Sequence, residues 1–296
     1  MPRTERRAVL LMLAALTCLI MLDASGKWMA QRGVPVAAST WSRYFGHLIV
    51  VLAVFLPTRG AGVLRTGHPG RQALRGLLMV CITLLYFQAL KTMPLAQATA
   101  VFFTTPMLVT LLARFFLGER PGWITWLALA GGFTGVLVVI RPGTDLPLTG
   151  TLLVLGAAAA NAVYQTLTRA QSQADPPEVQ VLYAGLAGAA IMTLGVPLWW
   201  QDQWWVPLQL TAWDWAVFAM MGVLGASGHL LLSRAFRLTF ASRLTPWSYS
   251  QLLLAVLIGW LVFGDMPDGV ALLGMVMIAA SPQLTWLRRE AADRPR

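Results

Sequence analysis

The sequence predicts an all-α integral membrane protein with ten transmembrane helices, arranged as two inverted five-helix repeats. Three observations carry this prediction. The chain has a mean hydropathy of +0.65 and 11% charged residues, against roughly 25% in soluble domains. Its apolar residues fall into ten runs of span length, and the second half matches the first at an ungapped offset of 146 residues.

The ten spans follow from punctuation of the apolar sequence by Gly, Pro and charged residues, because about 20 apolar residues cross a roughly 30 Å hydrocarbon core. The first run follows Arg6 and Arg7, but it is longer than a signal-peptide core and lacks a clean cleavage site, so it is predicted to be a helix. The predicted spans are 8–28, 37–57, 73–92, 95–117, 121–141, 147–169, 178–198, 212–234, 241–263 and 267–287.

The formal net charge of +10 reports orientation and not nucleic-acid binding, because the basic residues sit singly or in small clusters between apolar runs with no aromatic interleave. With the N-terminus inside, nearly all arginines fall on the cytoplasmic side. The opposite side carries only Lys27, Arg32, Lys91 and Arg141. The positive-inside rule therefore predicts a multi-pass protein of the cell inner membrane with both termini in the cytoplasm.

Neither redox nor enzymatic chemistry is indicated. Cys18 and Cys81 both lie inside predicted spans, so neither a disulfide framework nor a CxxC motif is present. Three scattered histidines give no metal site, and HExxH, GxSxG and paired midplane acids are missing, which argues against an enzyme. We predict no cofactor.

The internal match is most specific where each half has a glycine, an acid and then a proline. Gly118-Glu119 meets Gly264-Asp265, and Phe103 meets Tyr249. The same offset divides the chain into repeats 1–146 and 147–296. Five spans per repeat force the halves into opposite orientations, which is typical of secondary transporters with a substrate site near the midplane.

The signatures Leu117-Gly118-Glu119-Arg120 and Phe263-Gly264-Asp265-Met266, with Arg43 in the second helix and the Asp23 to Trp28 exit of the first, resemble the EamA family of the drug/metabolite transporter superfamily. The second signature departs from the family pattern, since Asp265 and Met266 replace the usual Glu and Arg. The resemblance implies ten helices, cytoplasmic termini, a central cavity and alternating access. It leaves the cargo and the direction of transport open.

Ionisable residues inside spans are functional candidates because they are costly to bury. Asp23 and Arg43 lie at matched depth in the first two helices, which predicts an ion pair, and Lys27 and His47 follow them at i+4 on facing stripes. A structural lock is the leading interpretation. The alternative is an outer gate or a substrate contact.

The preferred binding region is a pair of polar-aromatic clusters at equivalent depth, one in each half. The fourth helix offers Phe102, Phe103, Thr104 and Thr105, and the ninth offers Ser248, Tyr249, Ser250, Gln251 and Leu252. Trp247 and Tyr249 are also predicted to be cavity walls. Pro106 either exposes a carbonyl to the cavity or is a harmless kink.

Four further inward-facing candidates come from other helices. Tyr86 and Tyr164 are predicted cavity walls, since aromatic rings hold planar or cationic solutes. Asn161 serves either the cargo or an interhelical hydrogen bond. His229 is a candidate for proton coupling, with a structural role as the alternative.

Two features are predicted to be architectural. Glu119 and Asp265 sit at helix C-termini beside capping glycines, where an acid needs a compensating contact. The glycine runs 131–135 and 222–228 predict close helix packing within the monomer, in preference to a dimer seam.

The leading functional hypothesis is a secondary transporter for a small organic metabolite that is amino-acid-like, aromatic or amphipathic, with export favoured over uptake. The alternative is uptake of a vitamin or nucleotide-like metabolite of the riboflavin or S-adenosylmethionine type. The remaining hypothesis is a channel or a structural membrane protein. The expected partners are a small-molecule substrate and the lipid bilayer, and the expected state is a monomer or weak homodimer.

Overall fold

The computed structural model describes residues 3–116, 122–141, 147–170, 176–199, 210–238, 244 and 247–281. Within these ranges every regular element is helical and no strand is formed. The all-α class predicted from the sequence is therefore confirmed.

The first half contributes a chain of helices joined by short connections. They are α1 (Arg3–Gln31), α2 (Val36–Arg59), the 3-10 helix η1 (Gly60–Leu64), α3 (Pro69–Leu90), α4 (Leu95–Phe102), α5 (Thr105–Phe116) and α6 (Trp123–Ile140). The second half contributes α7 (Leu148–Ala170), α8 (Pro177–Leu194), α9 (Val196–Trp199), α10 (Ala212–Leu238), α12 (Ser250–Phe263) and α13 (Gly269–Ala280).

These helices supply ten membrane segments. Seven stretches are long and apolar enough to span a bilayer, with α4 and α5 counted together, and three shorter apolar helices complete the set: Glu178–Leu194, Ser250–Phe263 and Gly269–Ala280. The ten-span architecture is thus confirmed. The predicted start of the ninth span and the end of the tenth fall largely outside the described residues.

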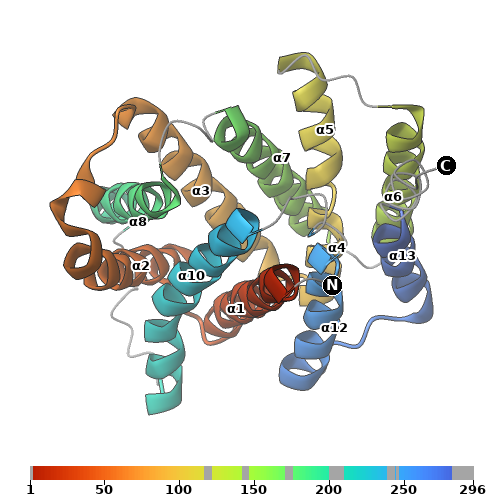
Figure 1. Cartoon of the computed structure of the whole chain (residues 1–296). Coiled ribbons are helices and arrows are strands. Elements are labelled where there is room, and N and C mark those ends of the chain that lie inside the picture. The colour runs from red at the N-terminus through yellow and green to blue at the C-terminus, as the bar shows by residue number, and fades with distance from the viewer. Residues whose placement is uncertain are drawn as a thin grey trace.

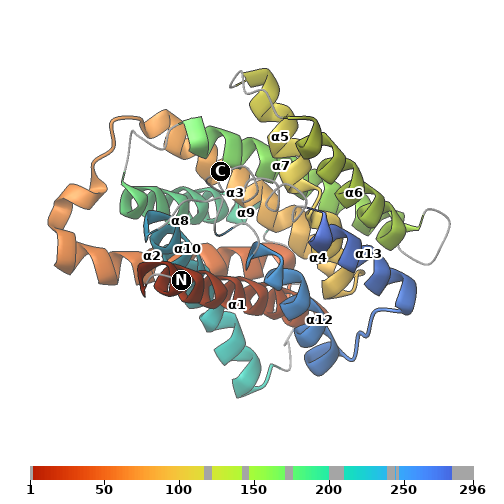
Figure 2. The ribbon, with the colours of Figure 1, turned by 45° about the vertical axis from the view of Figure 1, so that its right-hand side comes forward.

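The two halves are interlocked, because the largest interfaces join helices from different halves. Helix α1 packs on α10, α3 packs on α7, α2 packs on both α10 and α8, and α6 packs on α13. Figure 1 and Figure 2 place α1 within the bundle and set the α6–α13 pair at its edge, far from α2 and α8. The 146-residue offset converts the α1–α10 contact into the α7–α3 contact, so the packing follows the internal repeat.

Glycines permit the closest of these contacts. A Cβ atom at Gly222 would overlap the backbone of Gly46 in α2, and one at Gly135 would lie 2.8 Å from the carbonyl oxygen of Gly274 in α13. Gly76, which the offset pairs with Gly222, stands equally close to α8. The two glycine runs therefore serve close packing between helices of the monomer, as predicted.

Candidate functional site

The fourth span is broken in the bilayer core. Helix α4 ends at Phe102 after eight residues, a rise of about 12 Å, and α5 begins at Thr105. Pro106 has no N–H to donate to the Phe102 carbonyl, so this helical hydrogen bond is missing at the break. The Thr104 hydroxyl closes the break by donating to the Val101 carbonyl at 2.6 Å.

The ninth span is broken at the equivalent position. Tyr249 forms a turn before α12 begins at Ser250. The Ser250 hydroxyl donates to the Trp247 carbonyl at 2.6 Å, and the offset of 146 residues maps this bond onto the Thr104–Val101 bond. Leu252 takes the place of Pro106, so proline is not what interrupts this helix. The two halves share a break and its hydroxyl closure.

The two breaks meet through their aromatic rings. Phe103 and Tyr249, which are repeat equivalents, stack with ring centroids 5.2 Å apart and planes 24° apart. Both rings pack against a small apolar cluster that includes Ala100 and Leu252, and α4 contacts α12 directly. The pseudo-twofold relation between the halves thus passes through this ring pair.

Polar and aromatic groups surround the ring pair. The Tyr86 hydroxyl lies 3.1 Å from the Thr99 hydroxyl, and its ring meets Phe102 edge-on at 5.2 Å. Thr105 donates to the Ala158 carbonyl of α7 at 3.4 Å. Gln251 is half-buried one residue beyond the second break.

The structure places Tyr164 away from the breaks. Its hydroxyl accepts a hydrogen bond from Arg75 Nη2 at 3.1 Å, and its ring packs with a cluster around Tyr44 and Met79. Arg75 is itself buried and donates to Thr168 at 3.0 Å. Sequence reasoning counted Arg75 only as a cytoplasmic charge and missed this inward-facing arginine. Asn161 lies one turn from Tyr164 on α7.

The ion pair predicted between Asp23 and Arg43 is wrong. Among the described residues no ion pair joins them, although the Arg43 charge acts on Asp23 from a distance. Arg43 Nη1 instead donates to the Thr83 hydroxyl at 2.8 Å. The expected α1–α2 stripe does not form because α1 packs mainly against α10.

Lys27 pairs with Asp265 across the two halves. The Lys27 ammonium contacts the Asp265 carboxylate, donates to the Met93 carbonyl at 3.3 Å and lies 4.8 Å above the Phe263 ring. Gly264, at φ 71°, lets the chain turn so that the Asp265 N–H bonds to the Gly259 carbonyl at 3.1 Å. The capping glycine and the compensating contact predicted for Asp265 are confirmed. Glu119 lies outside the described residues.

His47 and His229 face one another between α2 and α10. Their ring centroids are 6.2 Å apart. His47 Nε2 lies 3.1 Å from the Val181 carbonyl of α8, whereas His229 Nε2 is buried without a hydrogen-bond partner among the described residues. The pair sits beside Arg43, and no described contact connects it to the helix breaks.

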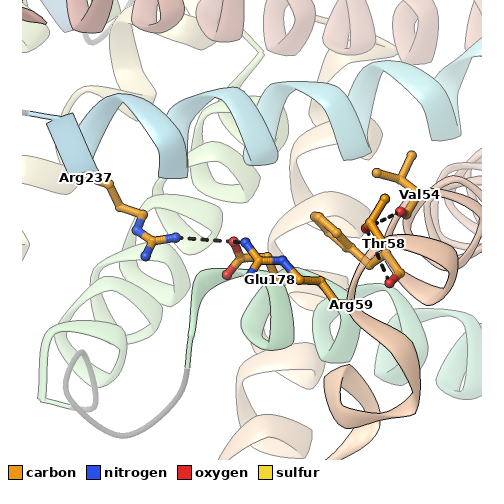
Figure 3. Close-up of polar contacts among 6 residues, drawn as sticks. Val54, Thr58, Arg59, Glu178 and Arg237 are labelled. Carbon is orange, nitrogen blue, oxygen red and sulfur yellow. Dashed lines mark hydrogen bonds and ion pairs between the residues drawn. The ribbon is translucent and has the colours of Figure 1, made fainter.

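Further ion pairs join the halves at both ends of the bundle. At the end where α1 and α3 finish, here the Lys27 end, Asp214 pairs with Arg32 at 3.4 Å, and Asp268 pairs with Arg141. At the opposite end, here the Arg237 end, Glu178 accepts from Arg59 at 3.4 Å and from Arg237 at 3.2 Å. Figure 3 shows both guanidinium groups converging on this carboxylate.

Asp268 also caps α13, since its carboxylate accepts the Ala271 N–H at 2.8 Å. The hydrogen bond from Arg141, followed by this backbone bond, lowers the pKa of Asp268 below its ordinary value of 3.8.

A ten-span bundle of two inverted, interlocked repeats with paired midplane helix breaks has the architecture of a secondary transporter. The EamA-like transporter family model matches residues 6–141 and again 148–286. The chain belongs to this family, so the resemblance predicted from the sequence is confirmed.

The chain is similar to transporters of several cargoes. A riboflavin transporter of Rhizobium johnstonii is 28% identical over 88% of this chain and 84% of its own length. One from Vibrio cholerae is 31% identical over 85% and 83%. An S-adenosylmethionine uptake transporter of Rickettsia felis is 27% identical over 86% and 84%, and the pseudopaline exporter CntI of Pseudomonas aeruginosa is 28% identical over 80% and 82%.

A solved structure described only as the crystal structure of a protein shares the fold. It aligns with a TM-score of 0.69 at 23% identity, over 95% of this chain and 98% of that one. The relatives are transporters and not enzymes, so this chain is a membrane-embedded transporter of a small molecule.

Proposed function

We propose that this transporter carries a planar heteroaromatic metabolite across the membrane by alternating access, and that the cargo binds at the paired helix breaks. The observation that carries the proposal is the Phe103–Tyr249 stack, in which two repeat-equivalent rings meet at 5.2 Å. Stacking of flat rings contributes roughly 0.5–1.5 kcal/mol per pair beyond area burial. A planar cargo that inserts between the two rings would replace the single Phe103–Tyr249 contact with two contacts, one to the ring of each half.

The groups beside the rings suit the polar edges of such a cargo. Thr105 and Gln251 are repeat equivalents within two residues of the stack. In a regular α-helix the N–H of residue 106 would donate to the Phe102 carbonyl. Because Pro106 has no N–H, this carbonyl is left as an acceptor at the break. Tyr86 and Phe102 add a second aromatic wall, and Trp247 lies two residues before Tyr249 at the second break. Asn161 and Tyr164 would act farther from the rings.

Alternating access requires that contacts between the halves break at one end while they persist at the other. The repeats that we divide at residues 1–146 and 147–296 are joined by Lys27–Asp265 at one end and by Arg59–Glu178 at the other. Both pairs are formed in this conformation. With both termini placed in the cytoplasm by the positive-inside rule, the Lys27 end faces outward.

For cargo class and direction we propose uptake of a flavin-like or nucleoside-like compound. The support is the riboflavin and S-adenosylmethionine uptake transporters among the relatives, together with the ring pair. This choice reverses the export favoured from the sequence alone. The pseudopaline exporter among the relatives makes the opposite direction the outcome to test against.

The test is counterflow in proteoliposomes loaded with unlabelled riboflavin, S-adenosylmethionine or an amino-acid control, followed by entry of the labelled compound. We expect one heteroaromatic compound to be exchanged, with trans-acceleration that a channel cannot give. Phe103→Ala should reduce exchange at least tenfold, because it removes one stacked ring and opens the contact between the halves.

The matched control is Phe45→Ala. Phe45 stacks on Trp41 with centroids 4.8 Å apart and planes 11° apart, within α2 and away from the breaks. This variant removes a stacked ring of similar geometry and should exchange like the parent. Equal exchange by the Phe103→Ala and Phe45→Ala proteins would refute the site, and an absence of trans-acceleration with every compound would refute the carrier mechanism.

A further inference from the structure

A basic hollow lies at the Arg237 end between α1 and α10, away from the helix breaks. It has a volume of about 240 Å³ and is lined by Arg7 and Leu11 of α1 and by Arg234, Arg237 and Leu238 of α10. Three exposed arginines, Arg7, Arg234 and Arg237, border this space, which is large enough for a phosphate group.

The arrangement is fixed by the packing of the two helices. Arg234 and Arg237 lie three residues apart on one face of α10, and Arg7 and Leu11 lie four apart on α1. Just beneath them the two helices are joined through a cluster that includes Ala8 and Ala235. The arginines thus stand at the rim of a rigid interface, with leucine side chains beside them.

Two of the three arginines have no described ion-pair partner. Within the part of the chain that the structure describes, ion pairs are formed by Arg237 but not by Arg7 or Arg234. The Arg237 bond to Glu178 is long at 3.2 Å, where charge-assisted bonds are usually 2.7–2.9 Å. Glu178 also pairs with Arg59, at 3.4 Å, so it holds Arg237 weakly. Figure 3 shows Glu178 lying between the two arginines.

We propose that this hollow binds the phosphate group of an anionic phospholipid, and that the phosphate competes with Glu178 for Arg237. Guanidinium groups bind phosphate oxygens in a bidentate manner, and basic hollows between membrane helices are suited to acidic headgroups. Leu11 and Leu238 give the acyl chains an apolar entry. Capture of Arg237 leaves Glu178 with Arg59 alone, which links lipid binding to the ion pair that joins the halves at this end.

Inorganic phosphate offers the same oxygens without acyl chains, so it separates the two sources of the ligand. The test uses the full-length transporter in neutral detergent, with native mass spectrometry to count bound phosphatidylglycerol against chain-matched phosphatidylcholine. A parallel thermal-shift titration uses inorganic phosphate. We expect phosphatidylglycerol to bind at least tenfold more tightly than phosphatidylcholine, and inorganic phosphate to produce no shift at millimolar concentration.

The variants locate the site. Each arginine near a membrane surface contributes about fivefold in affinity, so R7Q with R234Q should weaken phosphatidylglycerol binding about 25-fold. The matched control, R65Q with R71Q, removes two charges at other positions that the sequence also places on the cytoplasmic side, and should leave binding within twofold of the parent. E178Q frees Arg237 and should tighten binding severalfold.

Three results would overturn the proposal. Equal losses in the R7Q/R234Q and control proteins would mean general surface attraction, and a strong shift with inorganic phosphate would mean a free-anion site. Unchanged or weaker binding by E178Q would refute the competition for Arg237. None of these measurements depends on the cargo, so they stand or fall independently of the proposed transport function.

Discussion

The buried ion pair between Lys27 and Asp265 gives the sharpest mechanical prediction. The Lys27 side chain is 6% exposed and the Asp265 side chain 29% exposed, and the two belong to different halves. Asp265→Asn keeps the size and shape of the side chain but removes its charge. The lysine would keep the Met93 carbonyl at 3.3 Å and the Phe263 ring at 4.8 Å as its remaining partners.

The free-energy cost of Asp265→Asn depends on the interactions that Lys27 keeps. Removal of one partner from a buried ion pair costs about 3–5 kcal/mol. The partial exposure of Asp265 and the two remaining partners of Lys27 lower this figure to about 2 kcal/mol for the state closed at the Lys27 end. An energy of about 2 kcal/mol corresponds to roughly a 30-fold shift between closed and open populations.

Labelling of a buried cysteine measures that shift. Ser25 lies two residues before Lys27 and is buried, so Ser25→Cys should react slowly with a membrane-impermeant maleimide while the Lys27 end is closed. The background carries Cys18→Ala and Cys81→Ala to remove the native thiols. We expect Asp265→Asn to speed labelling about 30-fold, and Lys27→Met combined with Asp265→Asn to speed it less, because no unpaired charge is then buried.

The control is Asp268→Asn at the same end. Asp268 pairs with Arg141 between α6 and α13, a pair at the edge of the bundle, and its side chain is 61% exposed. An exposed pair contributes at most about 1 kcal/mol, so labelling should change by less than a factor of about five. Asp265→Asn labelling no faster than this control would refute the assignment of Lys27–Asp265 as the contact that closes this end.

Three further outcomes are expected. Gly222→Ala should destabilise the folded protein in detergent by about 3 kcal/mol, since the new methyl group meets the α2 backbone; Gly62→Ala, in open space, should unfold like the parent. The pKa of Asp268 is lowered in the folded state, so its carboxylate contributes its full stabilisation above the ordinary pKa of about 3.8 and loses it as the pH falls through the folded-state pKa. Asp268→Ala has no such contribution to lose, so its stability should fall less steeply than that of the parent below about pH 3.8. Pro106→Ala restores an N–H and should allow α4 to run into α5, with at least a tenfold loss of exchange and unchanged expression; full exchange would mean that the break is not needed.

Local features of this fold could be predicted from the sequence because they depend on neighbours along the chain. Span length, the glycine cap at Gly264 and the interruption at Pro106 are each written within a few residues. The break at Tyr249 has no proline and was not predicted; the internal repeat predicted only a polar-aromatic cluster at this depth. In an inverted repeat, a feature recognised in the sequence of one half indicates where to look for its equivalent in the other half.

The partners of the buried charges could not be predicted in the same way. Asp23 and Arg43 share a depth, but depth does not fix the rotation of a helix about its axis. Lys27 faces Asp265, 238 residues away, because α1 packs on α10 and α12 and has few contacts with α2. In the same way, the helix packing places the Tyr164 hydroxyl against Arg75 and away from the predicted site. Pairing between distant elements depends on packing that no local pattern encodes.

The two repeats differ in sequence at the position of Lys27, and a final prediction follows from this difference. The offset that pairs Glu119 with Asp265 pairs Gln173 with Lys27. By this sequence equivalence, the lysine and acid of one repeat correspond to an amide and an acid in the other, and Gln173 and Glu119 both lie outside the described residues. We infer that a lysine–carboxylate pair forms only at the Lys27 end, whereas Arg59–Glu178 joins the halves at the opposite end. We expect Gln173→Lys to favour closure of the opposite end and to speed labelling of Ser25→Cys by up to about 30-fold, the inverse of the same 2 kcal/mol. Gln173→Met, which adds no charge, is the control. Identical labelling in the two variants would mean that the resting conformation is set by helix packing and not by this single departure from symmetry.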